Sequence, residues 1–427
     1  MSLEKLLFKK IYIWVVLILV LLGFIAFIIF GSLVDYFAKG GHRFSYLKPI
    51  INQLISVPKN MMRTLNPNIH GLALDQNRFK NLQGLTLKNS NTEDGYLLLS
   101  GISKNNKKPE VLLIDLSKKK KIFSWKFDLE KFPDLRNKQI DTFQMKHPFL
   151  FKNGDLLFKD QHGPLIRFGK CSKIKWIKKG KYHHSIEIDD DENIWTSNVI
   201  ENKDFTDDSI EKISPEGKIL FKKSVFEILK ENYLDNLIVT AKETNDPIHL
   251  NDIQPVLQDS KFWMRGDLFL SLRNLSMVLL YRPSTNKILW YQQGPWVYQH
   301  DVDIVNKSNI AIFNNNMNLE KTSVNGFNNT IIYNFDKKKI LDPYRKAYKK
   351  NDIRTPEAGL SEIIKNEDII VEETLMGRIL RMNKKGEIIW QFINRSDDGK
   401  LYILSWSRYL DKKEVTNEFL KSIKKSC

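Results

Sequence analysis

Residues 184–221 read HSIEIDDDENIWTSNVIENKDFTDDSIEKISPEGKILF, and this stretch decides the fold. It contains short runs in which apolar and polar residues alternate, a period of two that is typical of β-strands. The runs are His184–Ile188, Asn193–Ser197, Ile210–Ser214 and Lys218–Phe221. Acidic, Asn-containing and Pro-Glu-Gly turn segments separate them, so the stretch predicts one antiparallel sheet of four strands.

The same module recurs along the chain. Its copies begin with apolar runs of similar pattern: Gly95–Ser100, His147–Phe151, His184–Ile188, His249–Val256, His300–Val305 and Leu360–Ile364. Copies of roughly 35–50 residues have the size of β-propeller blades. A β-sandwich would not explain so regular a spacing. We therefore expect an all-β fold, a six-bladed β-propeller in which the first strand of each blade lines the central channel.

An uncharged segment precedes the repeats, from Ile11 to Val34. As a helix it would span roughly 36 Å, more than the hydrocarbon core of a bilayer at about 30 Å. Trp14 lies near one end and Tyr36 near the other, as interfacial aromatic residues do. The apolar part of a signal peptide is shorter, so we expect an uncleaved, single-pass transmembrane helix. Its short basic N-terminus should stay in the cytoplasm, which places the propeller on the extracytoplasmic (periplasmic) side.

These features predict four parts of the chain. They are an N-terminal membrane anchor (residues 1–37), a stalk that leads into the propeller (38–90), the six-bladed propeller (91–395), and a C-terminal closing segment and tail (396–427).

The composition narrows the classes of function. The chain carries 67 Lys and Arg against 50 Asp and Glu, a formal charge of +17. The lysines form short runs where turns are expected, which indicates solvated loops that attract anions and no nucleic-acid surface. The chain has two cysteines, Cys171 and Cys427, which are too few for a metal site built on thiolates. They could form one disulfide bridge.

Four of the eight histidines open a copy of the module. His147, His184 and His300 stand in the same register before their second strands, and His249 begins the fourth copy. Any one of them alone could simply cap a turn. Four in matching places are expected to converge near the axis of the propeller. Pro148 follows His147, which has no polar neighbour in sequence, so we interpret His147 as structural.

Two further polar residues belong with these histidines. Asn251 lies two positions after His249, and therefore on the same face of the strand. Arg273 stands at the end of an apolar strand of the same copy. Together with His184 and His300, they form a set of imidazoles, a guanidinium and an amide that we expect around one small volume.

Two kinds of chemistry could use this set. Three imidazoles can hold zinc or copper, but a guanidinium beside a divalent metal is unfavourable unless an anion lies between them. An oxyanion explains both residue types, because arginine and protonated imidazoles donate charge-assisted hydrogen bonds. Phosphoryl transfer normally brings a glycine-rich loop or paired metal-binding carboxylates, and the sequence has neither motif. A sulfuryl group carries less charge and needs only nitrogen donors, so we expect no metal and no cofactor.

At these residues the sequence resembles the bacterial arylsulfotransferase family, six-bladed propellers that use an aryl sulfate as donor. The resemblance covers roughly residues 140–395. It rests, in order, on the segments His183–Ile188, Asp246–Asp252, Ser271–Ser276 and Gln299–Asp303, and on the sixth copy through Gly377–Ile379 and Gly386–Trp390.

The resemblance implies a two-step transfer of a sulfuryl group from an aryl sulfate to a phenol. His300 would be the nucleophile that forms a sulfohistidine. His184, His249, Asn251 and Arg273 would bind the sulfuryl oxygens, and one of the histidines could shuttle the phenolic proton. The partners implied are a small phenolic sulfate donor, a phenolic acceptor and, through the N-terminal helix, a membrane.

Four other residues are weaker candidates. Asp301 or Asp303 could orient His300. The family also has a threonine–lysine element near the sulfuryl site, for which Thr355 and Thr374 are the candidates in this sequence.

Two other functions fit the same pattern. The first is a non-catalytic, membrane-anchored propeller that binds a glycan or a partner protein, since the fold alone does not determine chemistry. In that case the histidines would contribute to stability only. The second is a metal-dependent enzyme that uses the same histidines, which would bind a stoichiometric ion.

Overall fold

The structure is a computed structural model that forms two compact units, Met1–Ile69 and His70–Cys427. It describes residues 12–38, 43–47, 50–51, 53–55, 57, 71–88, 95–101, 109–128, 132, 144–201, 204–318, 323–364 and 366–425.

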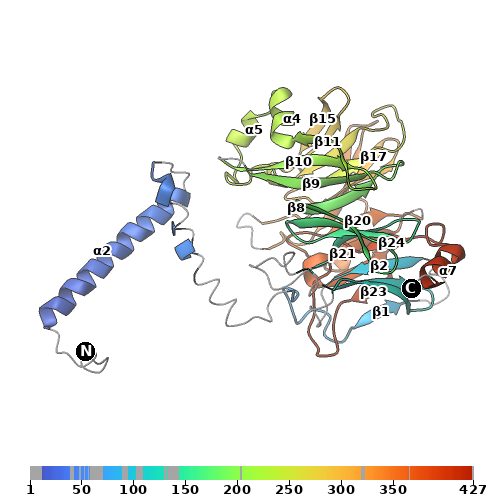
Figure 1. Cartoon of the computed structure of the whole chain (residues 1–427), viewed down its shortest axis with the longest axis horizontal. Helices are drawn as coiled ribbons and strands as arrows, with labels where there is room; N and C mark the ends of the chain where they lie inside the picture. The colour runs from blue at the N-terminus through green and yellow to red at the C-terminus, as the bar shows by residue number, and fades with distance from the viewer. Residues whose placement is uncertain are drawn as a thin grey trace. The chain divides into compact units, whose positions relative to one another are not determined.

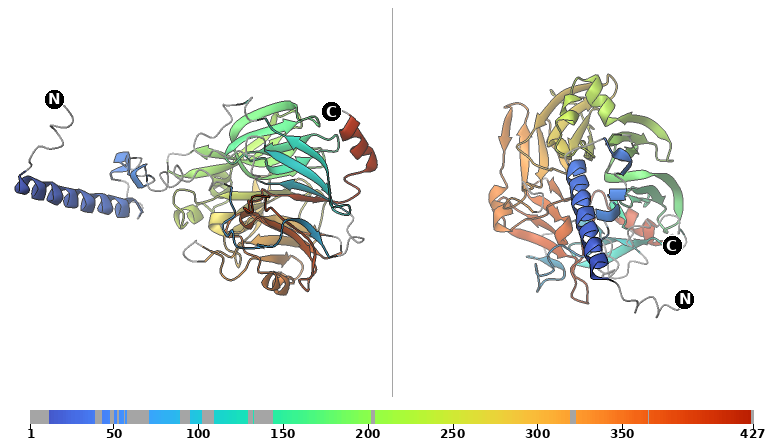
Figure 2. Two further views of the ribbon diagram at one scale, coloured as in Figure 1. Left: turned by 90° about the horizontal axis from the view of Figure 1, so that it is seen from below. Right: turned by 90° about the vertical axis from the view of Figure 1, so that its left-hand side faces the viewer.

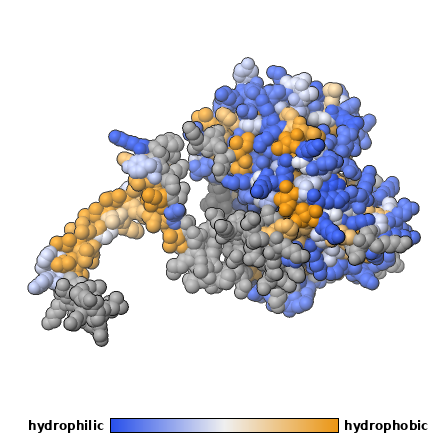
Figure 3. Space-filling view, in the orientation of Figure 1, coloured by the Kyte–Doolittle hydropathy of each residue, from blue (hydrophilic) through white to orange (hydrophobic). Residues whose placement is uncertain are grey.

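The first unit contains one long apolar helix, α2 (Ile13–Ala38), followed by a short 3-10 helix, η1 (Ser45–Leu47) (Figure 1). Residues Ile13–Phe37 are long and apolar enough to cross a membrane, and most of their side chains are exposed. Figure 3 shows apolar surface along α2, whereas the visible face of the second unit is mostly hydrophilic. The predicted N-terminal apolar helix is therefore confirmed. Its length and composition fit a membrane anchor and also a signal sequence.

The second unit is built from antiparallel sheets that follow one another around a centre (Figure 2). Two of the sheets are four-stranded and continuous in sequence. The first consists of β12 (Leu250–Pro255), β13 (Leu268–Leu272), β14 (Met277–Arg282) and β15 (Lys287–Gln293). The second consists of β16 (Val302–Asn306), β17 (Asn309–Asn314), β18 (Asn329–Asn334) and β19 (Lys339–Leu341).

Two sheets combine strands from distant parts of the chain. In the first, β24 (Arg408–Leu410) pairs with β2, in the order β24, β2 (Tyr96–Ser100), β3 (Glu110–Asp115) and β4 (Lys120–Lys126). In the second, β1 pairs with β23, in the order β1 (Gly84–Leu87), β23 (Ile388–Ile393), β22 (Arg378–Met382), β21 (Ile369–Glu373) and β20 (Leu360–Ile363). The two ends of the second unit are thus joined to its sheets by strand pairing.

The remaining sheet has seven strands. They are β5 (Lys146–Leu150), β6 (Leu156–Lys159), β7 (Gly163–Phe168), β8 (Ile174–Ile188), β9 (Ile194–Glu201), β10 (Thr206–Ile213) and β11 (Ile219–Ser224). The long strand β8 pairs with β7 through its first part and with β9 through its last part. Its pairing with β9 shifts register between His183 and Ile186, a β-bulge in the stretch that holds His184.

The prediction of an all-β, propeller-like fold with an N-terminal apolar helix is confirmed by this arrangement. The number of blades is a separate question, because β5–β11 form one continuous sheet.

Hydrophobic side chains fill the spaces between neighbouring sheets. One core cluster joins Ile210 of β10 to Leu250 and Leu270 of the next sheet, all with 0% exposure. Burial of such side chains contributes about 1.5–3 kcal/mol each and fixes the sheets around the centre.

Polar side chains also connect neighbouring first strands. Asp252 Oδ2 accepts a hydrogen bond from Val302 N at 3.0 Å, and Asp301 Oδ2 accepts one from Ser361 N at 2.9 Å. Ser185 Oγ accepts one from Ile253 N at 3.1 Å. We call these bonds the inner belt, and they set the positions of the strands that carry the histidines.

Short helices connect or follow the strands. They are α4 (Val225–Glu231), α5 (Asn236–Val239), η5 (Arg273–Leu275), α6 (Arg345–Lys350), η6 (Thr374–Met376) and α7 (Asn417–Lys425). Ser224 caps α4 by accepting a hydrogen bond from Glu227 N. Cys171 is disulfide-bonded, and the other cysteine, Cys427, lies outside the described residues.

Candidate active site

Three of the four histidines singled out in the sequence have an unusual backbone conformation. His147, His184 and His249 have φ angles of 49°, 53° and 52°, in the left-handed region that residues other than glycine rarely adopt. Tyr298, two residues before His300, has a φ of 56°. Such conformations persist only where the surrounding structure holds them, and they are common at functional sites. The repeated turn at the strand starts brings side chains from several sheets to the centre.

Three of the predicted residues meet there. His184 Nε2 and His249 Nε2 are 2.9 Å apart, with ring centroids at 4.9 Å. The ring centroid of His300 lies 5.7 Å from that of His184. The structure thus brings His184, His249 and His300, from three different first strands, into one cluster.

The hydrogen bonds of His300 define its tautomer. Its Nδ1 lies 2.7 Å from Asn315 Oδ1 and 3.3 Å from the Tyr298 carbonyl oxygen. Asn315 Nδ2 donates to the carbonyl oxygens of Thr355 and Ala358, so its Oδ1 is the atom that faces the ring. Nδ1 therefore carries the hydrogen. Nε2 keeps its lone pair, which accepts a hydrogen bond from Ala358 N at 3.0 Å.

Arg273 lies beside this cluster. Its backbone N donates to the His249 carbonyl oxygen at 3.0 Å, and its Nε donates to Asn274 Oδ1 at 3.0 Å. The guanidinium carbon is 5.1 Å from the centroid of the Tyr298 ring. Its charge lowers the pKa of both His249 and His300, which indicates that the guanidinium faces the same space as the imidazoles.

Burial keeps the imidazoles neutral. It is the main cause that lowers the pKa of His300 to about 3, and the charge of Arg273 adds to it. Burial, followed by the neighbouring histidines, also holds the pKa of His184 well below its usual value. At neutral pH, before an anion binds, the site therefore presents one permanent cation, Arg273, and neutral rings at His184 and His300, whose lone pairs can act as nucleophile or base.

Asn251 is fully buried close to this site. Its Nδ2 donates to the Gln299 carbonyl oxygen at 2.8 Å, next to His300 in the chain. Among the described residues its Oδ1 has no hydrogen-bond partner. The observed contact connects the strands that carry His249 and His300.

His147 lies at the start of β5 and is buried. Its ring packs on Trp406, with centroids 3.9 Å apart, and its Nδ1 has no partner in the part of the chain that the structure describes. Its structural interpretation fits this packing.

The four weaker candidates have different contacts. The carboxylate of Asp301 belongs to the inner belt, and both Asp301 and Asp303 line a pocket together with Glu362. The Thr355 carbonyl oxygen accepts a hydrogen bond from Asn315, the residue that contacts His300. Thr374 instead donates to Glu372 at 2.7 Å.

The sequence interpretation missed Asn315, the residue that orients His300. It directly follows β17, just as Arg273 directly follows β13. This shared position, immediately after the second strand of a sheet, was the signal that could have identified it.

It also missed partners of the other histidines. Asp246 Oδ2 pairs with His249 Nδ1, and Asp208 Oδ1 lies 2.7 Å from His183 Nε2. Lys159, with 0% exposure, donates its Nζ to the His184 carbonyl oxygen.

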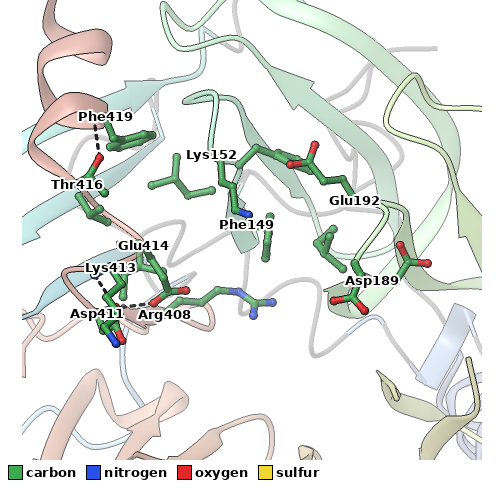
Figure 4. Close-up of a pocket in the computed structure, with 16 residues that line it drawn as sticks. Phe149, Lys152, Asp189, Glu192, Arg408, Asp411, Lys413, Glu414, Thr416 and Phe419 are labelled. Carbon is green, nitrogen blue, oxygen red and sulfur yellow. Dashed lines mark hydrogen bonds between the residues drawn. The ribbon is translucent and has the colours of Figure 1, made fainter. Parts of the chain in front are cut away.

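A pocket lies at the C-terminal ends of β5 and β8, the strands that hold His147 and His184. It has a volume of about 590 Å³, and Figure 4 shows Phe149, Lys152, Asp189, Arg408 and Phe419 around it. Its lining comes from the ends of β5 and β8 and from the C-terminal segment. None of its lining residues is a histidine, so it is distinct from the cluster at the strand starts.

Within the described residues, no group of three or more His, Cys, Asp or Glu side chains has the geometry to hold a metal ion.

The sequence profile of the arylsulfotransferase (ASST) family matches residues 144–395. The match covers more than half of the chain and contains His184, His249, Arg273, His300 and Asn315. The chain belongs to the arylsulfotransferase family. Membership supports a sulfotransferase-like enzyme that acts on small aryl molecules. No curated protein matches the chain.

Solved structures that resemble this member of the family do so at low sequence identity. A protein of unknown function from Bacteroides caccae is 11% identical, with a TM-score of 0.46, over 74% of this chain and 99% of that chain. Virginiamycin B lyase from Staphylococcus aureus is 12% identical, with a TM-score of 0.41, over 74% and 90%. A streptogramin B lyase is 14% identical, with a TM-score of 0.41, over 76% and 97%.

Proposed function

We propose that this arylsulfotransferase moves a sulfuryl group from an aryl sulfate to a phenol through a sulfohistidine on His300. The observation that carries the proposal is the hydrogen-bonded state of His300, whose Nδ1–H is held by Asn315 and whose Nε2 bears the lone pair. A buried, neutral imidazole in this tautomer is a competent nucleophile at neutral pH.

In the first step His300 Nε2 attacks the sulfur atom of the donor. A bond forms between nitrogen and sulfur, the bond between sulfur and the aryl oxygen breaks, and its electron pair goes to the aryl oxygen, which takes up a proton. In the second step the oxygen of the acceptor phenol attacks sulfur and gives up its proton. The bond between nitrogen and sulfur breaks, and its electron pair returns to His300 Nε2. Asn315 balances the positive charge that the ring gains by accepting the Nδ1–H bond throughout.

The other members of the cluster bind the sulfuryl oxygens. Arg273 offers a planar set of donors that suits an oxyanion. His184 and His249 lie beside His300 and can donate when protonated. We assign Asn251 to the same role, because its strand carries His249 and its Nδ2 reaches the residue before His300.

The aryl sulfate must displace one hydrogen bond, the one between Ala358 N and His300 Nε2, before it can react. The lone pair of His300 Nε2 is directed at Ala358 N in the present conformation. Its exchange for a contact with sulfur costs about 1 kcal/mol. The freed Ala358 N–H is then a donor beside the sulfuryl oxygens.

We further propose that the second unit is a six-bladed propeller. The strand β8 is long enough to end one four-stranded blade, β5–β8, and to begin the next, β8–β11. The other four sheets then supply one blade each. We propose residues 91–395 as the main part of the propeller, 38–90 as a stalk whose β1 adds a strand to one sheet, and 396–427 as a closing segment whose β24 completes another. We propose α2 as a single-pass anchor that places the propeller on the periplasmic side.

The test is to incubate the full-length protein in detergent with 4-nitrophenyl sulfate. We expect sulfate mass on the peptide that contains His300, and its loss when a phenol is added. The variant His300→Ala should transfer the sulfuryl group to the phenol at least roughly 10³-fold more slowly; we call this transfer phenol exchange. An unchanged exchange rate in this variant contradicts the assignment.

A further inference from the structure

The histidine pair at the centre is the middle of a longer hydrogen-bonded chain. Asp246 Oδ2 contacts His249 Nδ1, and His249 Nε2 lies 2.9 Å from His184 Nε2. An ionised carboxylate only accepts, so His249 Nδ1 carries a hydrogen. Two ring nitrogens at 2.9 Å share a hydrogen bond, so one of the two Nε2 atoms carries a hydrogen as well.

Asp246 is held in place from its main chain. Its carbonyl oxygen accepts a hydrogen bond from Asn274 Nδ2 at 2.5 Å. Asn274 also accepts from Arg273 Nε at 3.0 Å, so one side chain fixes both the carboxylate-bearing segment and the anion-binding guanidinium. The carboxylate is therefore placed by the same contacts that place the sulfuryl site.

From this geometry we infer that Asp246, His249 and His184 form an acid–base relay, in which Asp246 is the positioning residue and the two imidazoles exchange one proton with the aryl oxygen. The inference rests on the proposed function and specifies where its proton comes from. We call the three residues the Asp246 relay.

The proton count closes over the two steps. Asp246 engages His249 Nδ1, and the two Nε2 atoms engage each other, so the extra proton of the pair sits on His184 Nδ1. In the first step His184 Nδ1 gives this proton to the departing aryl oxygen as the bond between sulfur and oxygen breaks, and both imidazoles become neutral. In the second step the neutral pair takes the proton of the attacking phenol as the new bond between oxygen and sulfur forms. The bound sulfate anion beside the pair favours the protonated state before the first step.

The other histidines near the pair have different partners. His300 uses Nδ1 for Asn315 and Nε2 for sulfur. His183, only 1% exposed, is bound to the buried carboxylate of Asp208, whose second oxygen accepts from Leu250 N at 2.7 Å. The pair formed by His184 and His249 is therefore the one that can exchange a proton with the substrate.

The charges around His249 agree with this role. Burial lowers its pKa, the hydrogen bond and charge of Asp246 raise it, and the charge of Arg273 lowers it. The other titratable groups that face it are Asp208, His162, His183, His184 and His300. Asp246 is the group in hydrogen-bond contact that favours the protonated form.

The test compares Asp246→Asn with the wild-type full-length protein on two donors. Asparagine can still accept from His249 Nδ1 but carries no charge. Phenyl sulfate releases a phenol with a pKa of about 10 and needs the proton, whereas 4-nitrophenyl sulfate releases a more acidic phenol. We expect kcat/KM to fall by roughly 10²-fold for phenyl sulfate and by less than about 10-fold for 4-nitrophenyl sulfate. Asp246→Glu should restore part of the loss.

The pH profile provides a second measurement. Loss of the carboxylate removes a cause that raises the pKa of His249, so the limb of kcat/KM that belongs to the pair should move to lower pH. Asp336→Asn, in an exposed turn, is the matched control and should change neither measurement. An equal fall on both donors with an unmoved limb, or no fall at all, overturns the relay.

Failure of the proposed function can be distinguished from failure of the relay. A wild-type protein that turns over no aryl sulfate refutes the proposed function. The NMR titration of histidine carbons labelled with ¹³C then decides on the relay alone. A pKa of His249 that falls in Asp246→Asn supports it, and an unchanged pKa overturns it.

Discussion

At the scale of single residues, the main feature is that the buried His300 has an amide, that of Asn315, as the partner of its Nδ1. Its Nδ1 contacts the neutral amide of Asn315, and the charge of Arg273 faces it. An aspartate at this position would favour the protonated ring, which has no lone pair for attack. The amide orients the imidazole and leaves its pKa low.

This state predicts a pH dependence of stability. The pKa of His300 is about 3 in the folded protein and about 6.5 in the unfolded chain. Between these values the unfolded chain binds the proton and the folded protein does not. The contribution of His300 is therefore fully present above pH 6.5 and is lost as the pH falls toward 3, by at most about 1.4 kcal/mol per pH unit.

Urea unfolding at pH 7 and pH 5 measures this effect. The free energy of unfolding of His300→Gln should change less between the two pH values than that of the wild type. The comparison between proteins isolates His300 from Asp301 and Asp303, whose pKa values are raised by burial and by neighbouring carboxylates and act in the opposite direction. Equal changes in both proteins would contradict the prediction.

The residue pattern predicted part of this site. The register of His184, His249 and His300 indicated a common centre because strand starts repeat with the module. Asn315 escaped notice because it stands in a run of asparagines, and its contact with His300 joins residues that are 15 positions apart in the sequence. Asp246 was part of a motif, but its contact with His249 follows from the left-handed turn at that residue.

At the scale of elements, the inner belt determines where the first strands lie. Each of its bonds joins the side chain of one first strand to the backbone of the next. The bond between Asp252 and Val302 adjoins His300 in sequence. A change in this bond is therefore expected to affect both the stability of the protein and the position of His300.

Substitution of Asp252 tests the belt. Asp252→Ala leaves Val302 N without its partner in a buried place, which should cost about 1–3 kcal/mol in the free energy of unfolding. Asp252→Asn keeps one acceptor oxygen and should cost less. Urea midpoints of the three proteins provide the comparison. If Asp252→Ala is as stable as the wild type, the belt does not contribute as described.

At the scale of the whole molecule, the repeats predicted the all-β, propeller-like second unit. They did not predict the pairing of β1 with β23 or of β24 with β2, since alternation within a strand does not identify a partner hundreds of residues away. Nor did they predict that the module copies around β8 merge into one sheet, because the bulge that divides β8 keeps the strand continuous.

The helix α2 leads to a prediction about the intact chain. If α2 is retained as an anchor, the protein should stay in the membrane fraction after alkaline carbonate extraction, and its intact mass should include residues 1–38. A deletion of residues 1–38 should be released into the supernatant. A mature protein whose mass lacks this segment would identify α2 as a cleaved signal sequence.

The position of β24 affects how this protein is made. The strand β24 pairs with one edge of β2, so the backbone groups along that edge have no partner until residues 408–410 have left the ribosome. An unpaired strand edge in a nascent chain recruits other chains, and pairing between distant segments is slow. Biosynthesis of this protein therefore depends on protection of β2 until the last strand arrives, and chains interrupted before β24 are expected to be degraded or to aggregate.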